Sequence, residues 1–160
     1  MKFLKFINLV RNRFVGRKAG DNTYYINFQK FQAKEILKEI KNRGIDLSSM
    51  NVLELGAGEG GYSLIFKENA KSFTVSDIDK PKIFENDSSL NYKKVDVTKK
   101  FPFKDNTFDF IFSCSLIEHI KDPRVMLKEA RRVLDKNGYL YLSFPPFYSP
   151  VGGHQLKPFH

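Results

Sequence analysis

Four glycines in ten residues, in VLELGAGEGG at 52–61, constrain the fold more than any other feature of the sequence. The apolar residues before them are typical of a strand, and the residues after them have the apolar spacing of a helix. Such a turn brings backbone N–H groups and the positive end of the helix dipole to one point. Gly56 and Gly58 have no Cβ to hold a ligand away, and Gly61 lets the helix pack closely on the strand. The stretch therefore predicts a ligand site formed by bare main chain.

Strands and helices alternate along the rest of the sequence. β-Branched and aromatic runs bounded by turn residues predict strands at 51–55, 72–76, 91–97, 108–115 and 139–144. A helix is predicted over 61–69, between the first two of these strands. This alternation is the pattern of an α/β fold with a doubly wound, mainly parallel sheet.

Two further helices are predicted from apolar spacing and from their end signals. One covers about 23–43 and ends at Gly44. The other has Asp122 as its cap and Pro123 at its first position, and ends at Asn137-Gly138. Its predicted core positions are Met126, Leu127, Ala130, Val133 and Leu134.

The net charge of +9 is concentrated at the N-terminus. Residues 1–20 hold six Lys and Arg residues and no acid, so the other 140 residues carry 21 basic and 18 acidic side chains. Apolar residues at helical spacing (Phe3, Ile7, Val10 and Phe14) predict a basic amphipathic helix over 1–20, followed by one domain over 21–160.

Three roles stay open for the basic helix: a lid over the ligand site, contact of residues 1–18 with an anionic membrane, or contact with RNA phosphates. Nucleic acid is the least favoured partner because the rest of the sequence shows no basic face. No apolar run approaches the ~18 residues of a membrane-spanning helix. We expect a cytoplasmic protein, with peripheral membrane contact as an option. The single cysteine, Cys114, is expected to be a buried structural thiol.

Two acidic residues indicate which ligand the glycine turn binds. Asp77 ends the second predicted strand, 21 residues after Gly56, where an acid can bind both hydroxyls of a ribose. This spacing fits both NAD and S-adenosylmethionine. Glu54, two residues before the first glycine, would repel a pyrophosphate and attract an ammonium. S-adenosylmethionine has an ammonium and a sulfonium but no phosphate, so Glu54 favours it over NAD.

The sequence from about residue 48 to 146 resembles a known family. The segments VLELGAGEGGYS, VSDID and VDVTKKFPFKDNTFDFIFSCSLIEHIKDPRVMLKEARRVLDKNGYLYLSFP are together similar to class I S-adenosylmethionine-dependent methyltransferases of the type 11 family. The resemblance implies a Rossmann-like core. It also implies transfer of a methyl group from S-adenosylmethionine, with S-adenosylhomocysteine as product, to a small-molecule or lipid-linked acceptor.

The resemblance implies a role for individual residues. Glu54 would interact with the methionyl ammonium, and Asp77 would hold the ribose hydroxyls. Asp96 and Val97 match the pair that contacts the adenine, and Ser113 matches the residue beneath the methionyl group. The full set of implied cofactor-binding residues is Glu54, Gly56, Ala57, Gly58, Asp77, Ile78, Asp96, Val97 and Ser113.

No catalytic base and no metal site are predicted. Methyl transfer from a sulfonium needs alignment and exclusion of water rather than a covalent protein nucleophile. His119 is the one candidate for orienting an acceptor. Glu118-His119 is similar to part of a metal-binding Glu-x-x-Glu-His stretch, but Ser115 replaces its first glutamate. Tyr24 and Tyr25 lie at the start of the helix predicted over 23–43, where they would pack or approach the sulfonium by cation–π attraction.

The C-terminal end differs from the family pattern, in which two more strands follow the fifth. The chain ends at His160, sixteen residues after Phe144. We therefore expect a sheet that lacks the C-terminal hairpin, with 139–144 as an apolar edge strand. Three explanations stay open: the sequence is a fragment of a longer chain, a second copy or another partner covers this edge, or the fold is a shortened one. A non-catalytic S-adenosylmethionine-binding subunit of a larger assembly is the alternative function, and an NAD-dependent oxidoreductase is less favoured.

Overall fold

The computed structural model describes residues 22–87 and 89–145. The basic helix predicted over 1–20 lies outside the described residues, as does the tail from 146 onward. The helices are α2 (Thr23–Asn42), α3 (Ser63–Phe66) and α4 (Arg124–Val133), with short 3₁₀ helices η1 (Leu47–Ser49), η2 (Lys82–Phe84) and η3 (Ile117–His119). The strands are β1 (Asn51–Leu55), β2 (Ser72–Asp77), β3 (Tyr92–Lys94), β4 (Phe108–Cys114) and β5 (Leu134–Ser143). No helix within these described ranges has the length and apolar character needed to cross a membrane.

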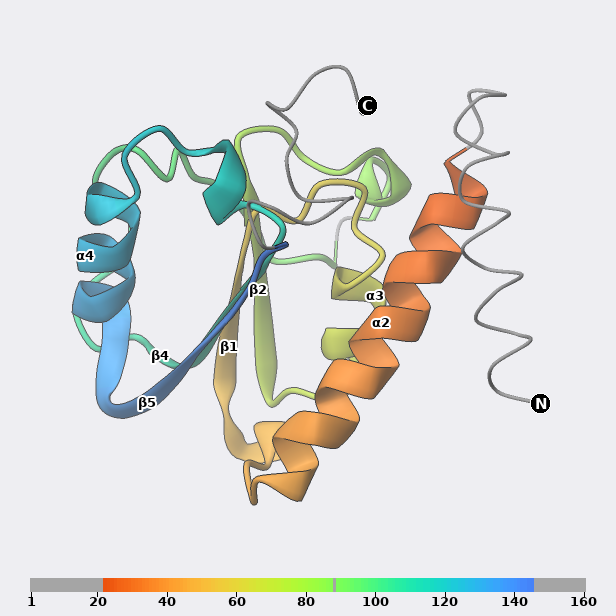
Figure 1. Ribbon diagram of the computed structural model, residues 1–160, viewed down its shortest axis with the longest axis horizontal. Coiled ribbons are helices and arrows are strands. Elements are labelled where there is room, and N and C mark those ends of the chain that lie inside the picture. Colours follow the sequence, from red (N-terminus) through yellow and green to blue (C-terminus); the bar gives the residue numbers. More distant parts are fainter. Residues whose placement is uncertain (1–21, 88, 146–160) are drawn as a thin grey trace.

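The five strands form one sheet in the order β3-β2-β1-β4-β5, and every neighbouring pair is parallel. α2 covers one face of the sheet and α4 covers the other (Figure 1). The predicted doubly wound α/β fold is therefore confirmed. Because the strands are parallel, all their carboxyl ends lie at one edge. The strand order reverses between β1 and β4, and ligands of doubly wound sheets bind at this reversal.

Alternate residues of the central strands pack into two separate cores. Val52 and Phe112 belong to the core beneath α2, whereas Leu53 and Ile111 belong to the core beneath α4. All four side chains are fully buried. Phe66 of α3 stacks on Phe112 with ring centroids 4.0 Å apart. Burial of both sheet faces explains why β1 and β4 are almost continuously apolar.

Two predicted elements are shorter in the structure. The helix predicted over 61–69 has one α-helical turn, because the side chain of Asn69 donates to the Ile65 carbonyl at 2.8 Å while the Asn69 N–H bonds to Phe66. The strand predicted over 91–97 ends at Lys94. There Asp96 instead closes a turn, in which its carboxylate accepts the Thr98 N–H at 3.0 Å.

The predicted end of the last helix, at Asn137-Gly138, is wrong. α4 ends at Val133, and the chain passes directly into β5, where Leu134 pairs with Phe108 and Tyr139 pairs with Phe110. Residues 135–138 bulge between these two pairings. A Cβ on Gly138 would lie 2.8 Å from the Asp109 carbonyl oxygen, so this glycine permits the close approach.

The core prediction for α4 is confirmed except at one position. Met126, Ala130, Val133 and Leu134 are buried, but Leu127 is 37% exposed. At the start of the helix, Asp122 accepts the Arg124 N–H at 3.1 Å, but the N-cap residue is Pro123 rather than the predicted Asp122. The helix bounds begin at Arg124, one residue later than predicted.

Arg132 connects the loop before β4 to α4 through hydrogen bonds and ion pairs. Its guanidinium donates to the carbonyl oxygens of Phe101 and Phe103 at 3.1 and 2.9 Å. It also forms ion pairs with Glu129 and Asp105 at 2.6 and 2.7 Å. Glu129 completes the contact by accepting the Phe101 N–H at 2.9 Å. The loop and the helix therefore form one continuous surface.

Candidate cofactor-binding site

A pocket of about 280 Å³ lies at the carboxyl ends of β1 and β4, where the strand order reverses. The glycine turn after β1 forms one wall, and the end of β4 with the first half of α2 forms the others. Its lining residues are Tyr25, Phe28, Gln29, Gln32, Gly56, Ala57, Gly58, Glu59, Tyr62, Cys114 and Ser115. The fold thus places the glycine turn where a doubly wound sheet binds its ligand.

The structure favours glycine at positions 56 and 58 of the turn for two different reasons. Gly56 and Gly58 have φ angles of +77° and +54°, which side-chain-bearing residues rarely adopt. A Cβ on Gly56 would lie 2.8 Å from Leu116, so Gly56 makes room for that side chain. A Cβ on Gly58 would meet no atom within 4 Å and would enter the open space at the turn. Gly58 is therefore the glycine that leaves room for a ligand.

Gly61 allows a close approach to α2 rather than to a strand. A Cβ at this position would lie 2.6 Å from Gln29 and 2.8 Å from the Ile26 carbonyl oxygen. The Gly61 N–H donates to the Gln29 side chain at 3.1 Å, within the buried interior. The packing role predicted for Gly61 is confirmed, but its partner is different.

Most N–H groups of the turn are already bonded within the protein. Gly56 and Ala57 donate to the Ser76 carbonyl at 2.9 and 3.1 Å, and Gly58 donates to the Asp77 carboxylate at 2.8 Å. These donors, and that of Gly61, are not available to a phosphate. The expected cradle of N–H groups is thus wrong, and the single turn of α3 adds little helix dipole. The turn suits a ligand without a pyrophosphate.

Glu54 is a buried carboxyl at the end of β1, with 1% of its surface exposed. Burial raises the pKa of Glu54 to about 8, although the hydrogen bond from the Ser63 hydroxyl opposes the shift. The negative charge of Asp77 raises this pKa further. Glu54 therefore holds a proton at neutral pH unless a cation comes close to it. An ammonium is a ligand group that would convert it to the ionised form.

A second acidic group, Glu118, lies close enough to the pocket wall to act on Cys114. The Oε2 atom of Glu118 is buried and has no hydrogen-bond partner among the described residues. Burial first, then the charges of Glu54 and Glu118, raise the pKa of the Cys114 thiol to about 12. Cys114, predicted as a buried structural thiol, is a half-buried neutral thiol in the pocket wall. The surplus of carboxyl groups favours a cationic ligand.

Asp77 ends β2 and is half-buried. Its two carboxylate oxygens accept the N–H groups of Gly58 and Ile78 at 2.8 and 2.6 Å. A carboxylate has about four lone-pair positions, so two remain for the hydroxyls of a ribose. Ile78 beside it is 54% exposed and offers an apolar surface at the same strand end.

The adenine-side residues lie at the end of the neighbouring strand. Lys94, the last residue of β3, pairs with Asp77, and Asp96 and Val97 follow it. The Thr98 hydroxyl donates to Asp96 at 2.6 Å, and Lys99 forms an ion pair with it at 2.9 Å. These hydrogen bonds, with Thr98 foremost, lower the pKa of Asp96 to about 2. Asp96 is therefore an ionised acceptor throughout the physiological range.

The structure places the other predicted residues as follows. Gly56, Ala57 and Gly58 line the pocket. Ser113 is 2% exposed and donates to the Leu55 carbonyl at 2.9 Å, which ties β4 to β1 beneath the turn. His119 is exposed on η3. No three His, Cys, Asp or Glu side chains in residues 22–87 and 89–145 are grouped to hold a metal ion.

Several wall residues were not predicted as site residues. Gln29 is buried, and Gln32 accepts a hydrogen bond from the Tyr62 hydroxyl at 2.9 Å. Both glutamines precede the apolar stripe of α2. Polar residues just before such a stripe are the sequence signal that could have indicated these wall residues. Ser115 has a φ of +54° at the end of β4, and no sequence signal indicates this conformation. Tyr25 lines the pocket, whereas Tyr24 is 38% exposed.

The sheet order, the glycine turn at the strand reversal and the acids ending β1 and β2 define a Rossmann-like cofactor-binding protein. A family profile described as "Methyltransferase domain" matches residues 53–142, more than half of the chain. The chain belongs to this family, the class I S-adenosylmethionine-dependent methyltransferases.

Individual relatives agree with this assignment. An uncharacterized methyltransferase of Mycobacteroides abscessus is 24% identical over 98% of this chain and 60% of its own length. A probable S-adenosylmethionine-dependent methyltransferase of Mycobacterium tuberculosis is 29% identical over 71% of this chain and 43% of its own length. The chain therefore spans about half the length of these curated relatives.

Solved structures share the fold. The trans-methyltransferase CalH, in complex with SAH, is similar with a TM-score of 0.61 and 19% identity, over 90% of this chain and 49% of that one. A SAM-dependent methyltransferase from Aquifex aeolicus has a TM-score of 0.58 and 26% identity, over 72% of this chain and 64% of that one. These similarities confirm the Rossmann-like architecture.

Proposed function

We propose that this chain binds S-adenosylmethionine and takes part in methyl transfer to a small-molecule or lipid-linked acceptor. The observation that carries the proposal is Glu54, a buried carboxyl whose pKa is raised by burial and which lies beside a turn with open space at Gly58. A cationic methionyl end would ionise Glu54 and gain a charge-assisted hydrogen bond. NAD has no ammonium to pair with this acid, and the N–H groups of the turn that could bind its pyrophosphate already form hydrogen bonds within the protein.

The protein's own residues would position the cofactor along the strand ends. Glu54 would take the ammonium, the two remaining lone pairs of Asp77 the ribose hydroxyls, and Asp96 the adenine amino group. Bound there, S-adenosylmethionine supplies a methyl group attached to a positively charged sulfur. Residues of α2 in the pocket wall would exclude water and align an acceptor.

No residue of the pocket wall is needed as a covalent nucleophile. The Cys114 thiol stays neutral because burial raises its pKa to about 12, and the thiolate is the reactive form. His119, the sequence candidate for orienting an acceptor, is exposed on η3. Its role remains a prediction.

Titration calorimetry with S-adenosylmethionine, S-adenosylhomocysteine and NAD tests the proposal. We expect both adenosyl compounds to bind and NAD not to bind. Asp77→Asn should weaken binding by roughly 10-fold or more, because it removes a charged acceptor for hydroxyl groups. Asp79→Asn is the matched control, because the side chain of Asp79 is 89% exposed and makes only a long ion pair, 3.8 Å, with Lys94.

Tight NAD binding without a response to the adenosyl compounds would contradict the proposal. A screen of metabolite and lipid extracts for methylated products tests the transfer step separately. Cofactor binding with no product in any extract would favour the alternative, a non-catalytic S-adenosylmethionine-binding subunit.

A further inference from the structure

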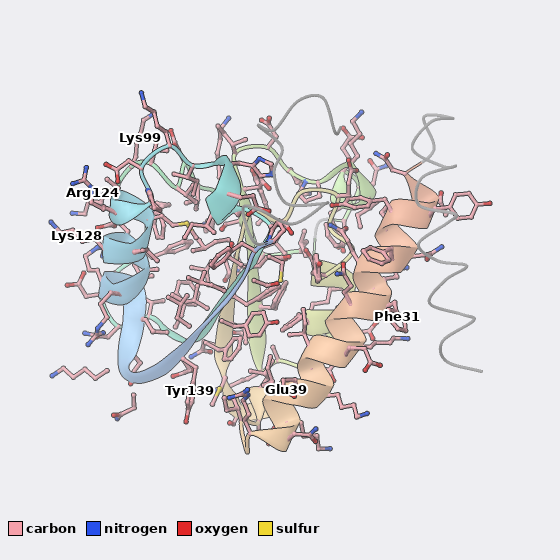
Figure 2. All side chains as sticks on the ribbon, viewed as in Figure 1. Phe31, Glu39, Lys99, Arg124, Lys128 and Tyr139 are labelled. Carbon is pink, nitrogen blue, oxygen red and sulfur yellow. The ribbon has the colours of Figure 1, made fainter. Side chains whose placement is uncertain are left out.

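The outer surface of α4 carries a row of basic side chains. Arg124, Lys128 and Arg131 are exposed and follow one another at spacings of four and three residues, so they lie on one side of the helix. Figure 2 shows Lys99, Arg124 and Lys128 pointing away from the sheet on the α4 side of the molecule. The opposite side of the helix carries the buried Met126 and Ala130.

Nearby acids neutralise only Arg124 of this row, which pairs with Asp122. Residues 96–105 and 121–132, which Arg132 joins into one surface, are called the α4 face here. They contain eight basic and four acidic residues, a net charge of +4. Each acid pairs within the face: Glu129 and Asp105 with Arg132, Asp96 with Lys99, and Asp122 with Arg124. Lys100, Lys104, Lys121, Lys128 and Arg131 form no ion pair within the described part of the chain.

Like charges at these helix spacings repel, so an anionic partner would relieve a cost built into α4. Two apolar side chains flank the row: Val125 is 39% exposed and Leu127 is 37% exposed. A hollow of about 550 Å³ at the start of α4 is lined by Thr98, Lys121, Asp122, Arg124 and Val125. The surface thus combines unpaired cations, exposed apolar side chains and a recess beside them.

We propose that the α4 face docks on an anionic phospholipid surface. Several unpaired Lys and Arg side chains close to such a surface each add to the attraction, and the flanking apolar side chains suit the headgroup region. Nucleic acid fits less well, because the aromatic side chains of the face, Phe101 and Phe103, pack into the core beneath α4 and do not offer stacking surfaces.

The test measures binding of the full chain to vesicles without cofactor, so a failure here leaves the proposed function standing. Vesicles of phosphatidylcholine alone are compared with vesicles that also contain phosphatidylglycerol, at low and physiological salt. We expect binding only to the anionic vesicles, weakening as salt screens the charges. The variant Lys128→Glu with Arg131→Glu should lose roughly 10-fold or more of its vesicle partition.

The matched control is Lys34→Glu with Lys38→Glu, two exposed lysines of α2 on the opposite side of the sheet. It changes the net charge by the same amount, and the basic residues of 1–20 are present in all proteins compared. The control should stay within about two-fold of the unmodified chain. Thermal melting shows whether Lys128→Glu with Arg131→Glu impairs folding. If it does, the milder variant Lys128→Gln with Arg131→Gln repeats the test.

Equal losses in the α4 variant and the α2 control would overturn the proposal, since bulk charge would explain them. Vesicle binding by the α4 variant that is as strong as that of the unmodified chain would also overturn the proposal. Loss of duplex DNA binding with vesicle binding unchanged, measured in parallel, would assign the face to nucleic acid instead.

Discussion

Glu54 shows how the surroundings of one carboxyl group link folding to ligand binding. Its pKa is near 4.5 in an exposed setting, and burial raises that pKa to about 8 in the folded chain. Between these values the folded protein holds a proton that the unfolded chain releases. The folded state therefore loses stability as pH rises through this window, and the loss is complete above about pH 8.

Replacing Glu54 with Gln should remove this pH dependence. The amide keeps an oxygen that accepts the Ser63 hydroxyl, and it has no charge to bury. Without cofactor, the variant's stability relative to the unmodified chain should be lowest near pH 5 and should increase by about a few kcal/mol toward pH 8. Thermal denaturation over this pH range measures the difference. Parallel stability curves for the two proteins would contradict the pKa shift.

Sequence spacing could identify the site residues that lie at the ends of strands. Glu54 and Asp77 were predicted from their distance to the glycines, and the structure places both at the turn. Spacing could not reveal that Ser76 and Asp77 engage the turn's N–H groups, because β2 supplies those acceptors across the sheet. Sequence spacing could not predict the left-handed conformation of Ser115 either, since it depends on the junction of β4 with η3.

At the scale of elements, all five strands and the three α-helices within the described residues were predicted, while the three 3₁₀ helices and several element ends were not. Local patterns indicate that an element exists, but individual hydrogen bonds, local as well as tertiary, decide where it ends. Asn69 ends α3 by a side-chain bond to Ile65. Asn137-Gly138, a helix-ending signal by itself, forms a bulge because Leu134 already pairs with Phe108 in the sheet.

The contact between the glycine turn and α2 gives a prediction at this scale. Gly61→Ala would force its Cβ to 2.6 Å from Gln29, so we expect α2 to move away from the turn. The free energy of unfolding should fall by about 1–3 kcal/mol and cofactor binding should weaken. Denaturant unfolding and calorimetry measure the two effects.

Gly44→Ala is the control for Gly61→Ala. Its φ of +78° imposes backbone strain, but no atom lies within 4 Å of the added Cβ. It should lower stability by about 1 kcal/mol and leave cofactor binding unchanged. If Gly44→Ala weakened binding as much as Gly61→Ala, the specific role of the α2 contact would be wrong.

At the scale of the whole molecule, folding creates a charge distribution that the sequence does not show. Residues 21–160 appear nearly balanced, with 21 basic and 18 acidic side chains. The fold brings 96–105 and 121–132 together into the α4 face, which alone carries +4. Tyr139 and Phe144 of the predicted edge segment are 47% and 56% exposed. The partner or second copy expected at that edge stays a prediction.

We propose that a buried acid at the end of β1, Glu54, recognises the cationic end of S-adenosylmethionine. Proton release on binding tests this most directly, measured near pH 7 by calorimetry in two buffers of different ionisation enthalpy. Because its pKa is about 8, Glu54 should give up nearly one proton when the ammonium arrives, and Glu54→Gln should bind more weakly with no such release. Binding without proton release, or unchanged affinity in the Gln variant, would contradict the claim.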